Sequence, residues 1–225
     1  MKTLNTILAA VGALLMLSVT SANSLEFKAG VSANGMAAYA NAEERLKGNP
    51  QQRITNEEAI LATSFASAFV EISSDEAMGL GIGISYAPEV VDLEKETRTI
   101  QDATGDSGNA SGDQITDGKV NDLVSIYATM PIGEGAYVKA GYMQVDLNTI
   151  ENLATGGAYG NTSLDGYTLG VGYNHNMDNG AFFRVETNYM EIDGTELTNT
   201  NDSTKKVKAD GITGASVGLS VGKSF

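Results

Sequence analysis

The sequence contains no cysteine and no tryptophan, and it has only three prolines and one histidine. Without cysteine there is no disulfide framework and no lipid-modified cysteine, and one histidine is too few for a His/Cys metal site. Long apolar runs are also missing, apart from residues 7–17. That run is shorter than the roughly 20 residues of a spanning helix. If this chain crosses a membrane, it must therefore do so as a closed barrel, because only helices and barrels satisfy every backbone group in lipid.

Basic residues are scarce as well. There are 14 Lys and Arg against 28 Asp and Glu, so the formal net charge is −14. Residues 1–24 carry one charge, on Lys2, so the chain without them has a net charge of −14 − 1 = −15. A protein this acidic repels nucleic acid, and we exclude that class of partner.

The N-terminus has the layout of a secretory signal peptide. Lys2 precedes the apolar run, and residues 18–24 are mostly small. This order of charge, apolar core and small residues predicts export and removal of the segment. Cleavage after Ala22 and cleavage after Ser24 both satisfy the small-residue rule. We therefore expect residues 1–24 to be the signal peptide and residues 25–225 to form one β domain.

The last eleven residues form a two-faced strand, because side chains alternate with a period of two. One face carries only Gly and Ser, which is unusual for a surface facing water and indicates a narrow enclosed space. The opposite face is apolar and ends on an aromatic C-terminal residue. Its apolar residues are Val217, Leu219, Val221 and Phe225, and Lys223 on the same face can reach the lipid headgroups.

The same alternation predicts eight strands. Their ranges are 25–39, 60–73, 77–91, 118–131, 136–149, 163–177, 180–194 and 211–225. Three connections, at 73–77, 132–135 and 177–180, are tight turns, while those at 40–59, 92–117, 150–162 and 195–210 are long and polar. A short helix within Ala37–Leu46 is a further expectation. Alternating short turns and long loops are typical of barrels that span the outer membrane.

These features resemble the small eight-stranded OmpA-type and OmpX-type outer-membrane barrels of Gram-negative bacteria, over essentially all of residues 25–225. The resemblance implies an all-β, antiparallel, up-and-down transmembrane barrel with short periplasmic turns and long extracellular loops. It implies outer-membrane lipid and the barrel-insertion machinery as partners, and an unidentified partner for the extracellular loops. In that family the terminal strand, here Val217, Leu219, Val221 and Phe225, is the recognition signal for insertion.

A soluble alternative stays open at this point: a secreted eight-stranded sandwich or lipocalin-like barrel that carries a ligand. There the apolar faces would point inward and the Gly/Ser/Thr faces outward. The nearly uncharged polar faces, the unequal connections and the terminal Phe225 favour the membrane barrel.

Few charges fall on the predicted inward faces, and all of them lie near the short-turn ends. They are Glu26, Lys28, Glu71, Lys139, Arg184 and Glu186. Eight strands leave an interior only wide enough for side chains, so unpaired charges there would be costly. We therefore expect these charges to be paired. Glu71 and Lys28 lie on neighbouring strands, and Lys139 and Arg184 or Glu186 flank the sixth strand. The glycines Gly170 and Gly172 leave room for such long side chains.

The search for chemistry gives no catalytic residue and no cofactor. His175 is predicted at the short-turn end, with no serine in reach, so nucleophilic catalysis has no support. Residues 102–117 are rich in oxygen ligands but lack the spacing of an EF-hand, which leaves a calcium loop and a solvated acidic loop as alternatives. The sequence therefore predicts a non-enzymatic surface barrel with a charge-plugged lumen, with a narrow porin-like channel for ions or very small solutes as the alternative.

Overall fold

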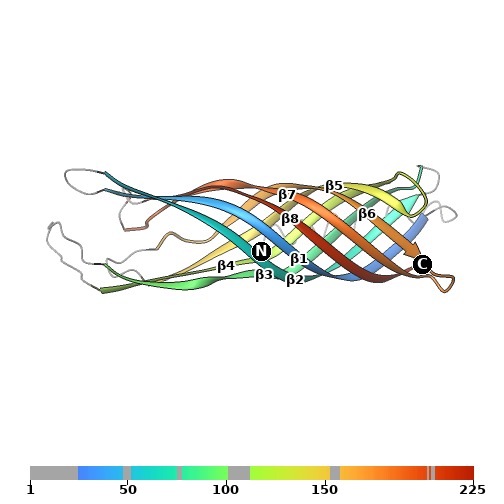
Figure 1. Ribbon diagram of the computed structural model, residues 1–225, viewed down its shortest axis with the longest axis horizontal. Coiled ribbons are helices and arrows are strands. Elements are labelled where there is room, and N and C mark those ends of the chain that lie inside the picture. The colour runs from blue at the N-terminus through green and yellow to red at the C-terminus, as the bar shows by residue number, and fades with distance from the viewer. Residues whose placement is uncertain are drawn as a thin grey trace.

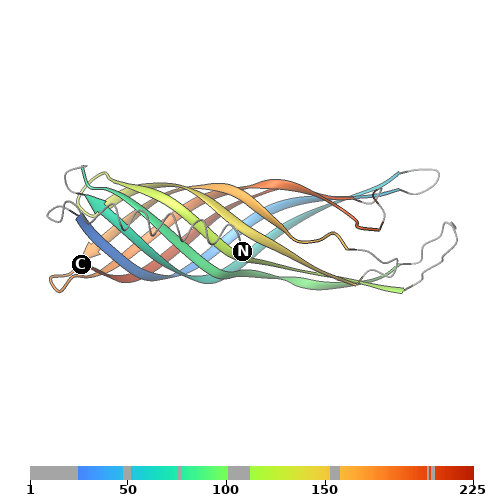
Figure 2. The same ribbon diagram turned by 180° about the vertical axis from the view of Figure 1, so that it is seen from behind.

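A computed structural model describes residues 25–47, 52–74, 78–100, 112–152, 158–201, 203 and 206–225. Eight antiparallel strands follow the chain in order, and β8 pairs back with β1 to close the barrel (Figure 1 and, from behind, Figure 2). Among the described residues, no helix has the length and apolar character that a membrane crossing needs. The strands are β1 (Leu25–Lys47), β2 (Gln52–Ser74), β3 (Leu80–Ile100), β4 (Gly112–Pro131), β5 (Ala136–Asn152), β6 (Thr162–Asn176), β7 (Ala181–Thr198) and β8 (Lys206–Ser224).

The predicted barrel is confirmed, but most of its strands are longer than expected. At the short-turn end the predicted bounds agree with the structure to within three residues. At the far end β1, β2, β3 and β4 continue well into the segments predicted to be long loops. The helix expected within Ala37–Leu46 is wrong, because this segment pairs with β2 and β8 and its backbone groups bond across the sheet.

The tight turns hold the strands in register at one end. Gly79 N donates to Ser74 O at 2.9 Å, Ile132 N donates to Ala136 O at 2.9 Å, and Met177 N donates to Ala181 O at 2.8 Å. Gly180 closes the last turn with a φ of +79°, a conformation that glycine adopts without a Cβ penalty. The C-terminal end is fixed beside them, since Phe225 N donates to Phe27 O at 2.8 Å.

A level of tyrosines divides the barrel into two sections. We call Tyr86, Tyr142, Tyr167 and Tyr189 the tyrosine ring, since neighbouring members lie within two residues of the same register step. The inner section runs from the short turns to this ring: 25–35, 65–74, 80–86, 124–131, 136–142, 167–176, 181–189 and 216–224. The outer section lies beyond it: 36–47, 52–64, 87–100, 112–123, 143–152, 162–166, 190–198 and 206–215.

Apolar side chains face outward over the inner section. Val31, Ile82, Leu169, Val185 and Leu219 are exposed, while their chain neighbours point into the barrel. The predicted orientation is thereby confirmed here, and the soluble-barrel alternative is wrong for this part, because its apolar rows would pack inside.

The outer section has the barrel's hydrophobic core. Five buried residues form it: Met143, Val145, Leu164, Met190 and Ile192. Met36, Val120, Leu123, Leu147 and Ile212 pack around them. This core lies inside the barrel directly beyond the tyrosine ring, since Met143 follows Tyr142 and Met190 follows Tyr189.

The hydrogen-bond ladders are also less regular in the outer section. The register shifts of the described ladders fall there or at its boundary: between Ala40 and Ala42, Glu89 and Val91, Leu93 and Glu96, and Asn121 and Val124. The β2–β3 ladder ends at the Ala68–Tyr86 pair although both strands continue. Beyond it, Thr63 Oγ1 donates to Val90 O at 3.1 Å.

Candidate functional site

A buried ion pair with two hydrogen bonds joins β7 to β2 across the barrel. Arg184 Nη1 donates to Glu71 Oε2 at 3.1 Å, and Arg184 Nη2 donates to Glu71 Oε1 at 3.2 Å. This parallel, two-bond geometry is the strong form of an ion pair. Both side chains are almost fully buried, at 5% and 3% exposure. Removing either partner would leave the other charge buried and uncompensated.

Aromatic rings surround the Arg184 guanidinium. Its Cζ lies 4.9 Å from the ring centroid of Phe69, 5.1 Å from that of Tyr137 and 5.5 Å from that of Phe182. A cation at such distances is attracted by the electron-rich ring faces. The rings also fill the space around the ion pair, so that Arg184 and Glu71 sit in a closed layer.

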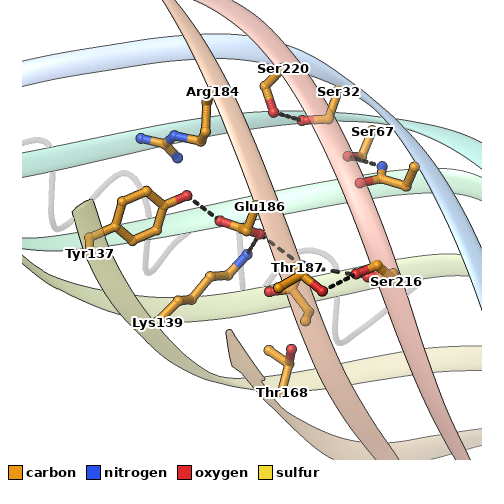
Figure 3. Close-up of polar contacts among 12 residues, drawn as sticks. Ser32, Ser67, Tyr137, Lys139, Thr168, Arg184, Glu186, Thr187, Ser216 and Ser220 are labelled. Atoms are coloured by element: carbon orange, nitrogen blue, oxygen red, sulfur yellow. Dashed lines mark hydrogen bonds and ion pairs between the residues drawn. The ribbon is translucent and has the colours of Figure 1, made fainter. Parts of the chain in front are cut away.

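A second ion pair lies one step farther from the short turns (Figure 3). Lys139 Nζ contacts Glu186 Oε1 at 2.7 Å, and Tyr137 Oη donates to Glu186 Oε2 at 2.5 Å. Asn188 Nδ2 donates to Glu186 Oε1 at 3.0 Å, and Lys139 lies 4.3 Å over the ring of Tyr127. Every oxygen of the Glu186 carboxylate therefore has a donor, which offsets the cost of its burial.

The third pair lies at the short-turn mouth. Lys28 Nζ contacts Glu26 Oε2 at 2.6 Å. Glu26 also accepts hydrogen bonds from Ser224 Oγ at 2.5 Å and from Ser73 Oγ at 3.3 Å. These contacts join β1, β2 and β8 where the barrel begins.

The structure places all six predicted charges inside the barrel but changes their partners. Glu71 pairs with Arg184 rather than with Lys28, although Lys28 and Glu71 are opposite each other in the β1–β2 ladder. Lys28 instead contacts Glu26 on its own strand. Lys139 pairs with Glu186, one of the two charged residues expected to lie on the other side of the sixth strand.

Sequence reasoning missed the roles of Tyr137 and Tyr127. Both reach into the lumen over glycines: a Cβ at Gly172 would lie 2.3 Å from the Tyr137 ring, and one at Gly83 would lie 2.4 Å from the Tyr127 ring. Gly172 thus makes room for Tyr137, and Gly170 makes room for Asn188, rather than for a charged side chain. The sequence does contain a signal for Tyr137. This tyrosine lies two residues before Lys139 on the same strand, so both side chains point to the same face.

A polar layer separates the ion pairs from the apolar core of the outer section. Ser32 Oγ and Ser220 Oγ share a hydrogen bond of 2.7 Å, and Asn34 Nδ2 donates to Ser67 Oγ at 3.1 Å (Figure 3). A cavity of about 70 Å³ opens among these groups, large enough for several water molecules. Two buried oxygens in its wall, Ser125 Oγ and Asn188 Oδ1, have no partner among the described residues.

A second cavity, of about 160 Å³, lies on the short-turn side of the Arg184–Glu71 pair. Its walls include Lys28, Ser73, Asn174 and Tyr137. Arg184 borders both cavities, so its guanidinium stands between two polar spaces. The Arg184 side chain, held by Glu71, therefore lies between the two cavities.

The other residues and segments singled out in the sequence are located as follows. His175 is exposed in β6 at the short-turn end, and the described residues hold no cluster of acidic and histidine side chains suited to a metal. Residues 1–24 lie outside the described residues, as does most of the 102–117 loop. Val217, Leu219, Val221 and Phe225 are all exposed on β8 and beyond its end.

An outward apolar band, a closed ladder and a lumen filled by ion pairs define a transmembrane β-barrel of the outer-membrane type. No family model and no curated protein matches the sequence. Among solved structures, OprG from Pseudomonas aeruginosa is similar at 13% identity over 90% of this chain and 96% of its own, with a TM-score of 0.49. AlkL, solved in lipid bilayers, has 11% identity over 90% and 91%, with a TM-score of 0.44. The outer membrane protease OmpT from Escherichia coli has 10% identity over 89% and 96%, with a TM-score of 0.36. These likenesses concern the fold.

Proposed function

We propose that this protein is a non-enzymatic surface barrel of the outer membrane, whose lumen is closed by ion pairs. The observation that carries the proposal is the two-bond Arg184–Glu71 pair, buried among three aromatic rings and spanning the barrel from β7 to β2. The Lys139–Glu186 pair adds a second closed layer. In this proposal the two ion pairs interrupt the aqueous path through the lumen.

The working surface is then the outside of the barrel and its acidic connections. The chain has twice as many acidic as basic residues, and its long polar connections share one end of the barrel. Loops on a rigid scaffold are the usual carriers of recognition. The proposal assigns them contact with a partner at the cell exterior, and assigns β8 with Phe225 the role of insertion signal.

A narrow channel is the second candidate, favoured by the two cavities that meet at Arg184. Rotation of the Arg184 side chain away from Glu71 would join them. Catalysis is the least supported role, since His175 is exposed on β6 at the end opposite the long loops.

Conductance in a planar bilayer separates these functions. The surface-barrel proposal expects the unaltered protein to be silent or nearly so, and Arg184→Ala to raise the conductance. Lys206→Ala, which removes the cation of the exposed Lys206–Glu196 pair, is the matched control and should stay silent. Steady ion currents through the unaltered protein would instead support the channel and overturn the closed lumen.

A further inference from the structure

The side-chain polarity of the barrel wall reverses at the tyrosine ring. In the inner section apolar residues point out, and the inward residues are mostly small or polar, as in Thr168–Leu169 and Ser220–Val221. The rings of Phe69 and Phe182 around Arg184 are exceptions. In the outer section the order is opposite. Consecutive residues on β5, β6 and β7 are there apolar inside and acidic outside, as in Val145–Asp146, Leu164–Asp165 and Ile192–Asp193.

The exposed large apolar residues follow the same boundary. Among the side chains that the structure describes, all but Tyr39 and Ile60 belong to the inner section or to its turns. Tyr39 and Ile60 are directly paired on β1 and β2, so the exception is one local patch. The apolar core, by contrast, lies wholly inside the outer section.

The ring tyrosines mark the boundary chemically. Tyr86 Oη donates to Asp122 at 2.5 Å, Tyr142 Oη donates to Asp165 at 2.5 Å, and Tyr167 Oη donates to Glu191. Tyr189 Oη donates to Glu191 at 3.1 Å. Tyrosine favours the interface between acyl chains and water, because its ring is apolar and its hydroxyl is polar. Each hydroxyl here contacts a carboxylate on the outer side of the ring.

The strand lengths require such a boundary. β1 and β2 have 23 residues each. At about 3.3 Å per residue and a tilt of about 40°, such a strand rises about 55–60 Å along the barrel. The lipid-facing band of an outer-membrane barrel is only about 25 Å tall, which leaves about 30 Å of strand beyond it. At the left of Figure 1 the β1–β2 and β3–β4 hairpins are seen as this extension.

We propose that the membrane ends at the tyrosine ring, and that the outer section stands in water as a β structure with its own apolar core. The surface of the inner section takes acyl chains, and the ring with its carboxylates lies among the headgroups of the outer leaflet. The outer section keeps its shape through Met143, Val145, Leu164, Met190 and Ile192 rather than through lipid. It lifts the acidic loops clear of the membrane surface.

Single cysteines test the boundary directly, because the chain has no other thiol. Val171→Cys and Val217→Cys lie on the inner section, and Thr198→Cys and Thr213→Cys on the outer section; all four positions are exposed. Each full-length variant is purified from outer membranes, reconstituted in phospholipid vesicles and labelled with a nitroxide. Collisions with oxygen report lipid, and collisions with a water-soluble nickel chelate report water.

The expected result is oxygen access at Val171 and Val217, and nickel access at Thr198 and Thr213. Oxygen-dominated collisions at both outer positions would show lipid along the outer section and overturn the proposal. A heat-modifiable band on an unheated gel confirms that each variant is folded. If a cysteine variant fails this check, a fluorescence quenching scan with brominated lipids, with Tyr142→Trp and Thr198→Trp as probes, replaces it. Quenching at the outer probe equal to that at the ring probe contradicts the proposal.

Discussion

The inner and outer sections both alternate polar and apolar side chains, but the apolar side chains point outward in the inner section and inward in the outer section. On β8 in the inner section, Ser220 points into the barrel and Val221 points out; on β7 in the outer section, Ile192 points in and Asp193 points out. Backbone geometry is the same in both, since each is a strand in an antiparallel ladder. The difference therefore lies in what surrounds the barrel, because apolar surface is stable against acyl chains and costly against water.

The interiors differ in the same way. The inner section is held by ion pairs that need every hydrogen bond in place, as at Arg184 and Glu71. The outer section is held by packed apolar side chains such as Val145 and Leu164. The inner section is therefore built like a membrane barrel, and the outer section like a protein that folds in water. The two sections should respond to different substitutions.

The largest expected effect comes from breaking the central ion pair. Arg184→Ala leaves Glu71 buried without its partner, which should lower the free energy of unfolding by about 3–5 kcal/mol. Urea titration in lipid vesicles measures it. The double variant Glu71→Met with Arg184→Met is the matched control and should be much closer to the unaltered protein, because no lone charge remains. Equal losses in the single and double variants would show that the pair acts only through packing.

The outer section should be sensitive to its core. Ile192→Ala removes buried methyl groups and should cost about 2–5 kcal/mol locally. Hydrogen exchange followed by mass spectrometry should show faster exchange in the outer strands and unchanged protection around Arg184. Leu169→Ala, on the lipid-facing surface, is the control and should leave the outer strands protected. Unchanged exchange in Ile192→Ala would argue against a core that holds this section.

A charged residue on the outward surface of the barrel should be costly in the inner section and tolerated in the outer section. Ile82→Arg puts a cation against acyl chains in the inner section, at an expected cost of about 2–4 kcal/mol near the middle of the membrane. Thr213→Arg puts the same charge on the outer section and should cost little. The fraction of heat-modifiable protein in outer membranes measures both. Equal yields of the two variants would contradict the polarity boundary.

The number of strands, the short turns and the outward direction of the apolar side chains in the inner section could be predicted from the sequence. Where one face of a strand meets lipid, apolar residues recur at every second position. The far ends of β1, β2, β3 and β4 were predicted to be loops, and register shifts in the ladders of β1 with β8, β3 with β4 and β4 with β5 interrupt the period there. Beside the shift between Glu89 and Val91, for example, consecutive Val90 and Val91 are both buried.

The partners of Glu71, Arg184 and Lys28 could not be predicted either. Arg184 and Glu71 are 113 positions apart and come from β7 and β2, which are not neighbours in the barrel. Sequence reasoning pairs adjacent strands, whereas a narrow lumen lets side chains meet across it. The tyrosines that fill this lumen depend on a close approach to glycine that only the three-dimensional structure reveals.

The close contact between Gly172 and the Tyr137 ring gives the smallest of the expected effects on stability. Gly172→Ala places a methyl group against the Tyr137 ring and should cost about 1–3 kcal/mol through overpacking. Gly35→Ala is a matched control in another strand, because nothing lies within 4 Å of its added Cβ. Urea titration compares the two, and a Gly172→Ala variant as stable as Gly35→Ala would mean that Tyr137 moves aside freely.

The central claim is that lipid ends at the tyrosine ring and that strands continue into water. Neutron reflectometry on the protein in a supported bilayer of deuterated lipid measures this most directly, since protein and lipid then scatter differently. The account predicts a protein layer that extends about 30 Å or more beyond the headgroups on the loop side, as the strand rise requires. A protein layer that ends within a few ångströms of the headgroups would contradict it.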